Sequence, residues 1–262
     1  MSIKLVSINI ERDKHLDRVI PFIQSEKPDV LCLQEVCEKD LSLFQKLMGG
    51  EYRFSPASRH MAEGQTMTDG EAVFARLPVR DWFAAQYAGS EEVSDCSDSM
   101  DVKERSKRIR RTITGCEIKR GTASFRIATT HFTWTPDGRV DAHQRQDVRA
   151  MLDAVLPLGE LVFCGDFNAP RGGEIFSFIN DHYHDAIPAR YKTSIDISLH
   201  RAGKERPEEL VDKMVDGLFL TPGYRAGGVR LERGVSDHCA VVAHIHIAGS
   251  RRIFNLWSIL RW

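Results

Sequence analysis

Short polar side chains follow apolar runs at several points of the chain, and their types could support chemistry. The clearest case is the apolar run 161–164, which is followed by Gly165, Asp166, Phe167 and Asn168. A short apolar run closed by Gly and Pro predicts a core strand, and open α/β sheets tend to keep their sites at the carboxyl ends of strands. The polar groups that follow predicted strands are Asn9, Glu35, His131, Asp166 with Asn168, Asp216, and Asp237 with His238.

These side-chain types limit the reaction. Each alone is weak evidence, because a single Asp after a strand is often only a turn residue or a helix cap. Together, carboxylates and amides favour a hard cation, so we expect Mg²⁺ or Mn²⁺ ahead of zinc. Such an ion polarises a phosphoryl oxygen, an Asp beside a His favours the cationic imidazole, and a further carboxylate can orient or deprotonate a water. Since the sequence has neither a Gly-rich phosphate loop nor a nucleophile-elbow serine, direct attack by a metal-assisted water is the economical interpretation.

Strand and helix patterns must position these groups. Apolar runs predict strands at 3–8, 30–33, 52–54, 71–75, 79–86, 111–119, 123–130, 161–164, 214–220, 228–231 and 239–247. Helical spacing predicts helices at 14–25, 40–48, 140–156 and 174–179. The first strand, helix and second strand have the order of a βαβ unit. Residues 55–70 are expected to form a polar loop that is either functional or mobile.

The segment 89–111 carries acidic residues followed by basic ones. We expect a charged surface hairpin or a flexible loop there. The acids would form a solvated face or, alternatively, a divalent-ion loop. The basic residues, which run from Lys103 to Arg111, would pair with the neighbouring acids or contact a polyanionic substrate. Arg111 is the candidate substrate contact in this block.

The composition indicates an ordinary globular protein. Its 262 residues are 42% hydrophobic and 28% charged, enough for one large domain or two small ones, and no linker divides them. The net charge of −1 at pH 7 gives no overall attraction to nucleic acid or anionic membranes. The scattered cysteines show no zinc-type spacing, no apolar span suits a transmembrane helix, and a strand at 3–8 leaves no room for a signal peptide. We therefore expect a reduced, cytoplasmic protein.

In their order along the chain, the motifs resemble those of the endonuclease/exonuclease/phosphatase superfamily. The matching motifs are Asn9 after the first strand, then Leu33, Gln34, Glu35, Val36, then Thr130, His131, then Gly165, Asp166, Phe167, Asn168, then Asp216, and finally Ser236, Asp237, His238. The resemblance covers residues 3–247. It implies the DNase I-like fold, an α/β class in which two packed mixed β-sheets are flanked by helices in a four-layer α/β/β/α sandwich. We therefore assign residues 1–248 to one catalytic domain.

The resemblance implies a metal site. Glu35 resembles the principal metal ligand, and Asn9 and Asp237 resemble groups near the metal, expected to be Mg²⁺ or Mn²⁺. Whether one ion or two bind is left open. Val36 and Cys37 depart from the pattern of the abasic-site endonuclease branch, and this difference argues against the DNA-repair role of that branch.

The resemblance also implies roles for five catalytic groups. Asp166 resembles the group that positions or activates the attacking water. Asn168 and His131 resemble phosphate contacts. His238 and its partner Asp216 resemble the pair that stabilises the pentacovalent phosphorus. Which of these groups is the general base is left open.

The leading prediction is a divalent-metal-dependent hydrolase that cleaves a phosphodiester by in-line attack of water. The alternatives are a phosphomonoesterase acting on a phosphorylated lipid or inositol headgroup, and a noncatalytic phosphate-binding module on the same scaffold. A nuclease would use the basic residues from Arg105 to Arg111, whereas a lipid or headgroup enzyme would depend on the C-terminal tail and on aromatic loop residues such as Trp134. The loops do not distinguish a nucleic-acid substrate from a lipid or small-molecule diester, and no obligate partner is evident.

The tail at 249–262 combines apolar residues at helical spacing with three arginines. This basic amphipathic pattern suits a membrane surface or a partner protein. Docking on the protein's own surface is the alternative, because so short a segment anchors weakly.

Overall fold

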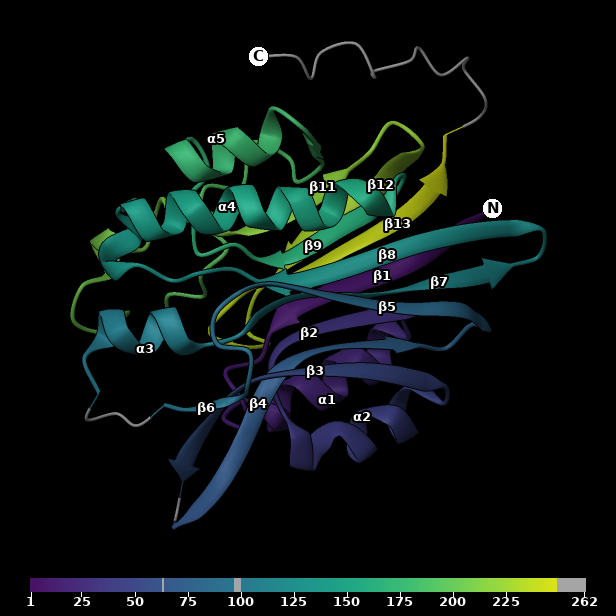
Figure 1. Cartoon of the computed structure of the whole chain (residues 1–262). Coiled ribbons are helices and arrows are strands. Elements are labelled where there is room, and N and C mark those ends of the chain that lie inside the picture. Colours follow the sequence, from purple (N-terminus) through teal and green to yellow (C-terminus); the bar gives the residue numbers. More distant parts are fainter. Residues whose placement is uncertain (63, 97–99, 249–262) are drawn as a thin grey trace.

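Two mixed β-sheets pack face to face, and helices cover their outer faces (Figure 1). The computed structural model describes residues 1–62, 64–96 and 100–248, so the prediction for the tail at 249–262 lies outside the described residues. Helices α1 and α2 lie on one side of the paired sheets, and α4 and α5 lie on the other. The expected four-layer α/β/β/α sandwich is therefore confirmed.

Each sheet mixes parallel and antiparallel neighbours. The seven-stranded sheet consists, in spatial order, of β12 (Tyr224–Glu232), β13 (Ala240–Ile247), β1 (Ser2–Asn9), β2 (Val30–Cys37), β4 (Gln65–Ala75), β3 (Glu51–Ala62) and β6 (Ser94–Asp95). The six-stranded sheet consists of β10 (His184–Asp185), β11 (Asp216–Leu220), β9 (Val162–Asp166), β8 (Ala123–His131), β7 (Arg111–Arg120) and β5 (Val79–Ala88). Because β1 and β2 are parallel, and so are β8 and β9, the carboxyl ends within each pair lie at one edge.

Apolar side chains fill three layers between these elements. The helices are α1 (Leu16–Glu26), α2 (Leu41–Met48), α3 (Val102–Arg108), α4 (Ala142–Val155) and α5 (Glu174–Asn180). On β1, Leu5 points into the core between the sheets and Val6 into the core under α1 and α2, as the two-residue period of a strand requires. Met151 of α4 and Ile175 of α5 pack on the outer face of the six-stranded sheet. The strands and helices expected from apolar patterns are all present.

The prediction of a loop at residues 55–70 is wrong. Residues 55–62 belong to β3 and residues 65–70 to β4, and the two strands pair antiparallel from Glu51 opposite Ala75 to Ala62 opposite Gln65, with a register shift near Pro56. The outer part of the hairpin extends beyond the helices and is largely solvent-exposed, as at Met61. Since neither face of it is buried, its sequence lacks the alternation that identifies a strand.

The charged segment at 89–111 contains helix α3 rather than only a hairpin or loop. The side chain of Asp101 accepts hydrogen bonds from the backbone N–H groups of Lys103 and Glu104. Asp101 is thus the N-cap of α3, and Glu104 three residues later completes a capping signature that the sequence already contained.

All six cysteines are buried and none forms a disulfide. Within residues 1–62, 64–96 and 100–248, no helix is long and apolar enough to cross a membrane.

Candidate active site

The polar groups predicted to share a site lie at the seam between the two sheets. Asn9 ends β1 and Glu35 lies near the end of β2, both in the seven-stranded sheet. His131 ends β8 and Asp166 ends β9, both in the six-stranded sheet. Nδ2 of Asn9 donates hydrogen bonds to Oε1 of Glu35 at 3.1 Å and to Oδ2 of Asp166 at 3.2 Å. A single amide therefore joins carboxylates from both sheets.

Strand pairing fixes the neighbours of Asp166. The parallel pairing of β9 with β8 places His131 opposite Asp166, and the antiparallel pairing with β11 places Asp216 opposite it on the other side. Paired residues project from the same face of a sheet, so the three side chains converge. Oδ1 of Asp166 accepts the backbone N–H of Asn168 at 2.8 Å. Burial raises the pKa of Asp166, while the charges of His238 and His131 oppose that shift.

His238 lies between two carboxylates. Its Nδ1 is 2.8 Å from Oδ2 of Asp216, and its Nε2 is 3.7 Å from Oδ2 of Asp166. Burial alone would lower the pKa of His238, but the charges of Asp216 and Asp166 outweigh it and raise the pKa well above 6.5. The ring is therefore a cation at neutral pH, and its Nδ1–H donates to Asp216.

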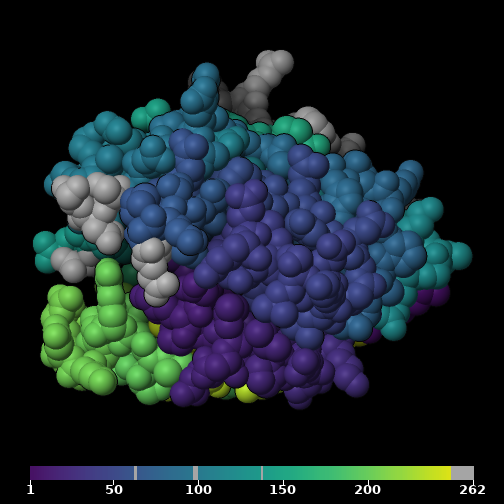
Figure 2. Space-filling view, turned by 90° about the horizontal axis from the view of Figure 1, so that it is seen from below, coloured from purple at the N-terminus to yellow at the C-terminus, as the bar shows by residue number. Residues whose placement is uncertain are grey.

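The loop that carries His238 is held by the polar segment at residues 193–206. Ile195 forms a β-bridge with His238, and the N–H of Cys239 donates to the carbonyl of Ser194 at 2.7 Å. The N–H of Asp196 donates to the carbonyl of Asp237 at 2.8 Å. Figure 2 shows this segment, in green, projecting beside the purple N-terminal part of the chain.

His131 is the second imidazole of the site. Its Nε2 is 3.5 Å from Oδ2 of Asp166 and 3.9 Å from Oε1 of Glu35. Burial lowers the pKa of His131 to about 4, even though the charge of Asp166 opposes the shift. His131 is thus neutral where His238 is cationic. When the surroundings shift the pKa values of two titratable groups in opposite directions, the two groups take different roles in the reaction.

Two site residues have a left-handed backbone conformation. Glu35 has φ 55° and lies where the register between β2 and β4 shifts, between Leu33 and Val36. Asn168 has φ 48°, and its Nδ2 donates to the carbonyl of Phe132 at 2.9 Å. Such conformations are uncommon for residues other than Gly and concentrate at functional sites. The bulge directs the Glu35 side chain to the seam.

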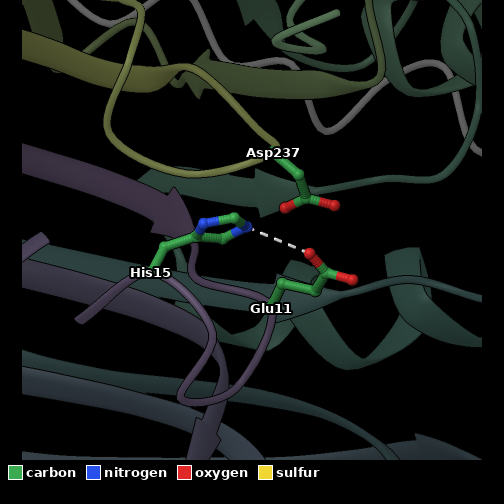
Figure 3. Close-up of side chains that lie close together, drawn as sticks. All are labelled: Glu11, His15 and Asp237. Carbon is green, nitrogen blue, oxygen red and sulfur yellow. Dashed lines mark hydrogen bonds and ion pairs between the residues drawn. The ribbon is translucent and has the colours of Figure 1, made fainter. Parts of the chain in front are cut away.

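Asp237 belongs to a neighbouring group that the sequence analysis missed in part. Ligand atoms of Asp237, Glu11 and His15 all lie within 4.8 Å of one another (Figure 3). Nε2 of His15 is 3.1 Å from Oε2 of Glu11. A signal was available, because Glu11 follows Asn9 by two residues and His15 follows Glu11 by four. Only the structure shows that they face Asp237.

Two predicted substrate contacts lie outside this network. Arg111 is only 2% exposed, and its Nη1 donates to the carbonyl of His131 at 3.0 Å. It is placed to hold the backbone of His131. Trp134 is 37% exposed on the loop after His131, beside α3. Their contact with substrate stays a prediction.

A sequence model of the Endonuclease/Exonuclease/phosphatase family matches residues 6–238. The chain belongs to this family. The match includes every motif from Asn9 to His238, so the resemblance found in the sequence is confirmed. Among curated protein sequences, none matches the chain.

Solved structures of the endonuclease/exonuclease/phosphatase family share the fold. A family member from Beutenbergia cavernae DSM 12333 has a TM-score of 0.72 at 19% identity, over 95% of this chain and 72% of that one. A mannosyl-6-phosphatase from Bacteroides thetaiotaomicron VPI-5482 has a TM-score of 0.65 at 11% identity, over 94% of this chain and 100% of that one. The human Nocturnin catalytic domain with bound sulfate has a TM-score of 0.64 at 18% identity, over 94% and 95%.

Members of the endonuclease/exonuclease/phosphatase family are generally metal-dependent hydrolases of phosphoesters, and the donor groups of this chain fit a divalent cation. Carboxylates of Glu11 and Asp237 lie together, and the nearby charges of Glu11 and Glu35 help to raise the pKa of Asp237 to about 6, although burial is the larger cause. Several acidic oxygens at one edge are the ligands that hard cations prefer. Glu35, Asn9 and Asp237 would hold such an ion, and the carboxylate of Glu11 lies beside Asp237.

Proposed function

We propose that this chain hydrolyses phosphodiester bonds with Mg²⁺ or Mn²⁺ and a water nucleophile. The observation that carries the proposal is the position of Asp166, whose carboxylate lies 3.5 Å from neutral His131 and 3.7 Å from cationic His238. One carboxylate between two imidazoles of different charge can orient a water while both rings bind phosphoryl oxygens. The acidic groups beside it would supply the metal ligands.

Each residue has a distinct task in the proposed reaction. A divalent ion held by Glu35, Asn9 and Asp237 would polarise a phosphoryl oxygen and offset the developing charge. Asp166 accepts a hydrogen bond from the attacking water and takes its proton. The raised pKa of Asp166 suits a base, because a proton acceptor works best when its pKa approaches the working pH.

The remaining groups bind the phosphoryl oxygens. His238 is kept cationic by Asp216 and stabilises the negative charge that grows on phosphorus-bound oxygens. His131 donates a hydrogen bond as a neutral ring, and Asn168 offers the amide hydrogen that Phe132 does not use. These roles are consistent with in-line attack from the side of Asp166.

Turnover of bis(4-nitrophenyl) phosphate tests the proposal. We expect hydrolysis with Mg²⁺ or Mn²⁺ and none in excess chelator. Asp166→Asn and His238→Gln should each lower kcat by at least about 10² to 10³, the usual cost of removing one preorganised group. Asp153→Asn and His244→Gln are matched controls on the exposed surface. Near-normal turnover by both site variants would contradict the assignment.

The monoester reaction remains the second candidate, because one similar structure is a mannosyl-6-phosphatase. Faster turnover of 4-nitrophenyl phosphate than of its diester would favour it. A phosphate-binding module without catalysis would instead bind vanadate or phosphate and show no turnover with any metal. Comparing both substrates across Mg²⁺ and Mn²⁺ separates the three cases.

Cytoplasmic localisation stays a prediction from the sequence, as does contact between the 249–262 tail and a membrane surface or a protein. Assignment of residues 1–248 to one catalytic domain is also a prediction. Removing the tail and measuring binding to anionic liposomes, together with the melting temperature, tests both tail alternatives. Lost liposome binding favours the membrane contact, and a lower melting temperature favours docking on the protein itself.

A further inference from the structure

A cavity of about 140 Å³ lies between α3 and the loop that follows His131. Its lining includes Lys103 and Lys107 of α3, Trp134 and Thr135 of the loop, and His143 at the start of α4. The cavity therefore brings one aromatic ring and two lysines from separate parts of the sequence to one place. Neither the family resemblance nor the proposed chemistry assigns it a role.

The cavity is close to the proposed active site and its wall is well fixed. Trp134 follows His131 by three residues, which limits their Cα separation to about 11 Å. The carbonyl of Trp134 accepts a hydrogen bond from the hydroxyl of buried Ser106 at 2.7 Å. The carbonyl of Thr133 accepts a hydrogen bond from the side-chain amide of Gln144 at 2.9 Å, and the hydroxyl of Thr133 donates one to Asp147 at 2.5 Å. A ligand bound in the cavity would therefore lie at a fixed distance from the catalytic groups.

The cavity lining carries two lysines, Lys103 and Lys107, and one carboxylate, Asp141, whose Oδ1 already accepts a hydrogen bond from the backbone N–H of Gln144 at 2.8 Å. Because the lysines outnumber the acid, the lining favours an anion. Lys103 forms no side-chain hydrogen bond or ion pair with any residue that the structure describes. Lys107 pairs with Glu104 at 2.9 Å, but both side chains are about half exposed, and such surface pairs contribute little. A phosphate can therefore displace Glu104 at small cost and bind both lysines.

The aromatic wall favours a base over a lipid chain. A cavity of roughly 150 Å³ holds one benzene ring, so there is room for one aromatic ring against Trp134. Basic side chains interleaved with an aromatic ring are the usual means of binding single-stranded nucleic acid. Among large apolar side chains exposed in the described part of the chain, only Val102 joins Trp134 here. That surface is too small to insert into a membrane.

We propose that this cavity is a subsite for one nucleotide of a single-stranded polynucleotide whose neighbouring phosphodiester lies at Asp166. The base stacks on Trp134, and its phosphate lies between Lys103 and Lys107. The inference rests on the proposed diester hydrolysis and names the substrate class. It also joins two features that the sequence treats as alternatives, the basic block and the aromatic loop.

Binding of a labelled oligothymidylate to the full chain tests the subsite, with Asp166→Asn in every sample to prevent cleavage. The double variant Lys103→Gln/Lys107→Gln should weaken binding at least tenfold. It should also reduce the slope of log K against log salt by about 0.7, which corresponds to one phosphate contact on a single strand. The control is Lys46→Gln/Lys119→Gln, which removes the same charge from exposed positions on α2 and at the far end of β7.

The stacking contact has its own test. Trp134→Leu should weaken oligothymidylate binding about 5-fold to 150-fold, the range expected for one base stacked on an aromatic side chain, and should not change binding of an abasic strand of equal charge. Leu156→Ala, at an exposed position 59% accessible, is the control.

Equal affinities for all variants and controls would overturn the subsite. A second cavity lies beside residues 196–198, and Lys204→Gln/Arg233→Gln changes its charge. If this variant loses oligothymidylate binding while the α3 variants keep it, the subsite is not at the α3 cavity. Trp134-dependent binding to phosphatidylserine vesicles without oligonucleotide binding would assign the cavity to lipid instead. Turnover of bis(4-nitrophenyl) phosphate by the wild-type chain is measured separately, because its absence would contradict the proposed function whatever the binding results are.

Discussion

The two imidazoles of the site have different charges because their carboxylate neighbours lie at different distances. Nδ1 of His238 lies 2.8 Å from Asp216, close enough for the carboxylate to keep the buried ring cationic. Among the described residues, the carboxylates that face Nε2 of His131 lie farther away, Asp166 at 3.5 Å and Glu35 at 3.9 Å. Burial therefore dominates the pKa of His131. The strand register that spaces these groups also sets their protonation.

Glu71 is a buried carboxyl behind the site that the sequence analysis did not single out. It lies on β4, is 1% exposed, and neither carboxylate oxygen accepts a hydrogen bond from any described residue. Burial raises the pKa of Glu71 to about 8, although the charge of Arg111 opposes the shift. The protonated form is therefore the one that the folded protein favours.

This raised pKa predicts a pH dependence of stability. Below about pH 4.5 Glu71 is neutral in both states, and as the pH rises from there to about 8 only the unfolded chain ionises it. The free energy of unfolding should therefore fall across this range, on the order of a few kcal/mol. Glu71→Gln should remove this loss, so its stability relative to wild type should increase from pH 5 to pH 8 and then level off.

Urea unfolding in chelator at several pH values measures this difference without contribution from bound metal. Glu51→Gln, at an exposed position at the start of β3, is the matched control. Parallel stability curves for wild type and Glu71→Gln would show that Glu71 is ionised in the folded state.

At the scale of elements, Gly165 allows β9 to lie close enough to β8 to place Asp166 opposite His131. Gly165 has φ 138°, and a Cβ atom there would lie 2.0 Å from the carbonyl oxygen of Thr130 on β8. Only glycine allows this approach of the two strands. The parallel pairing that sets His131 opposite Asp166 depends on it.

We expect Gly165→Ala to destabilise the protein by at least about 2 kcal/mol, because it combines strain at positive φ with a backbone clash. It should also lower diester turnover, since β9 must shift away from β8. Gly172→Ala is the control, with φ 86° but open space around the added Cβ. Equal losses in urea unfolding and in turnover for the two variants would rule out the close approach as the cause.

The elements show what the sequence can and cannot predict. Strands with a buried face, such as β9, were predictable because their apolar runs end abruptly in polar residues. The β3 and β4 hairpin was not, because its outer part has no buried face. The bulge at Glu35 depends on pairing with a distant strand, which no local pattern reveals. Helix α3 was within reach through its capping residues Asp101 and Glu104.

At the scale of the whole molecule, the site exists only when the two sheets are docked. Asn9 and Glu35 come from one sheet, and His131 and Asp166 come from the other. Polar side chains tie the sheets together beneath the site, because Nε2 of Gln34 donates to Oγ1 of Thr129 at 2.8 Å and the hydroxyl of Thr114 donates to that of Ser55 at 2.7 Å. Sequence motifs identified the members of the site but could not show this seam, since it joins residues about 95 positions apart.

The Gln34 and Thr129 bridge gives a prediction for sheet docking. Thr129→Val should cost about 1 to 3 kcal/mol, because it leaves a buried amide N–H without an acceptor at this seam. Gln34→Leu should cost less, since Oε1 of Gln34 already accepts no hydrogen bond from the described residues. The double variant should be more stable than the sum of the single effects predicts, because it removes both partners together.

Urea unfolding of the two single variants and the double variant measures this coupling free energy, and diester turnover is followed in parallel. If the bridge sets the spacing between Glu35 and Asp166, turnover should fall in the single variants by more than the unfolded fraction explains. Thr221→Val is a control, because its hydroxyl is buried within one sheet against Leu161. Additive losses of stability with unchanged turnover would mean that apolar packing alone positions the sheets, because the core between them would then hold Glu35 and Asp166 in place without the polar bridge.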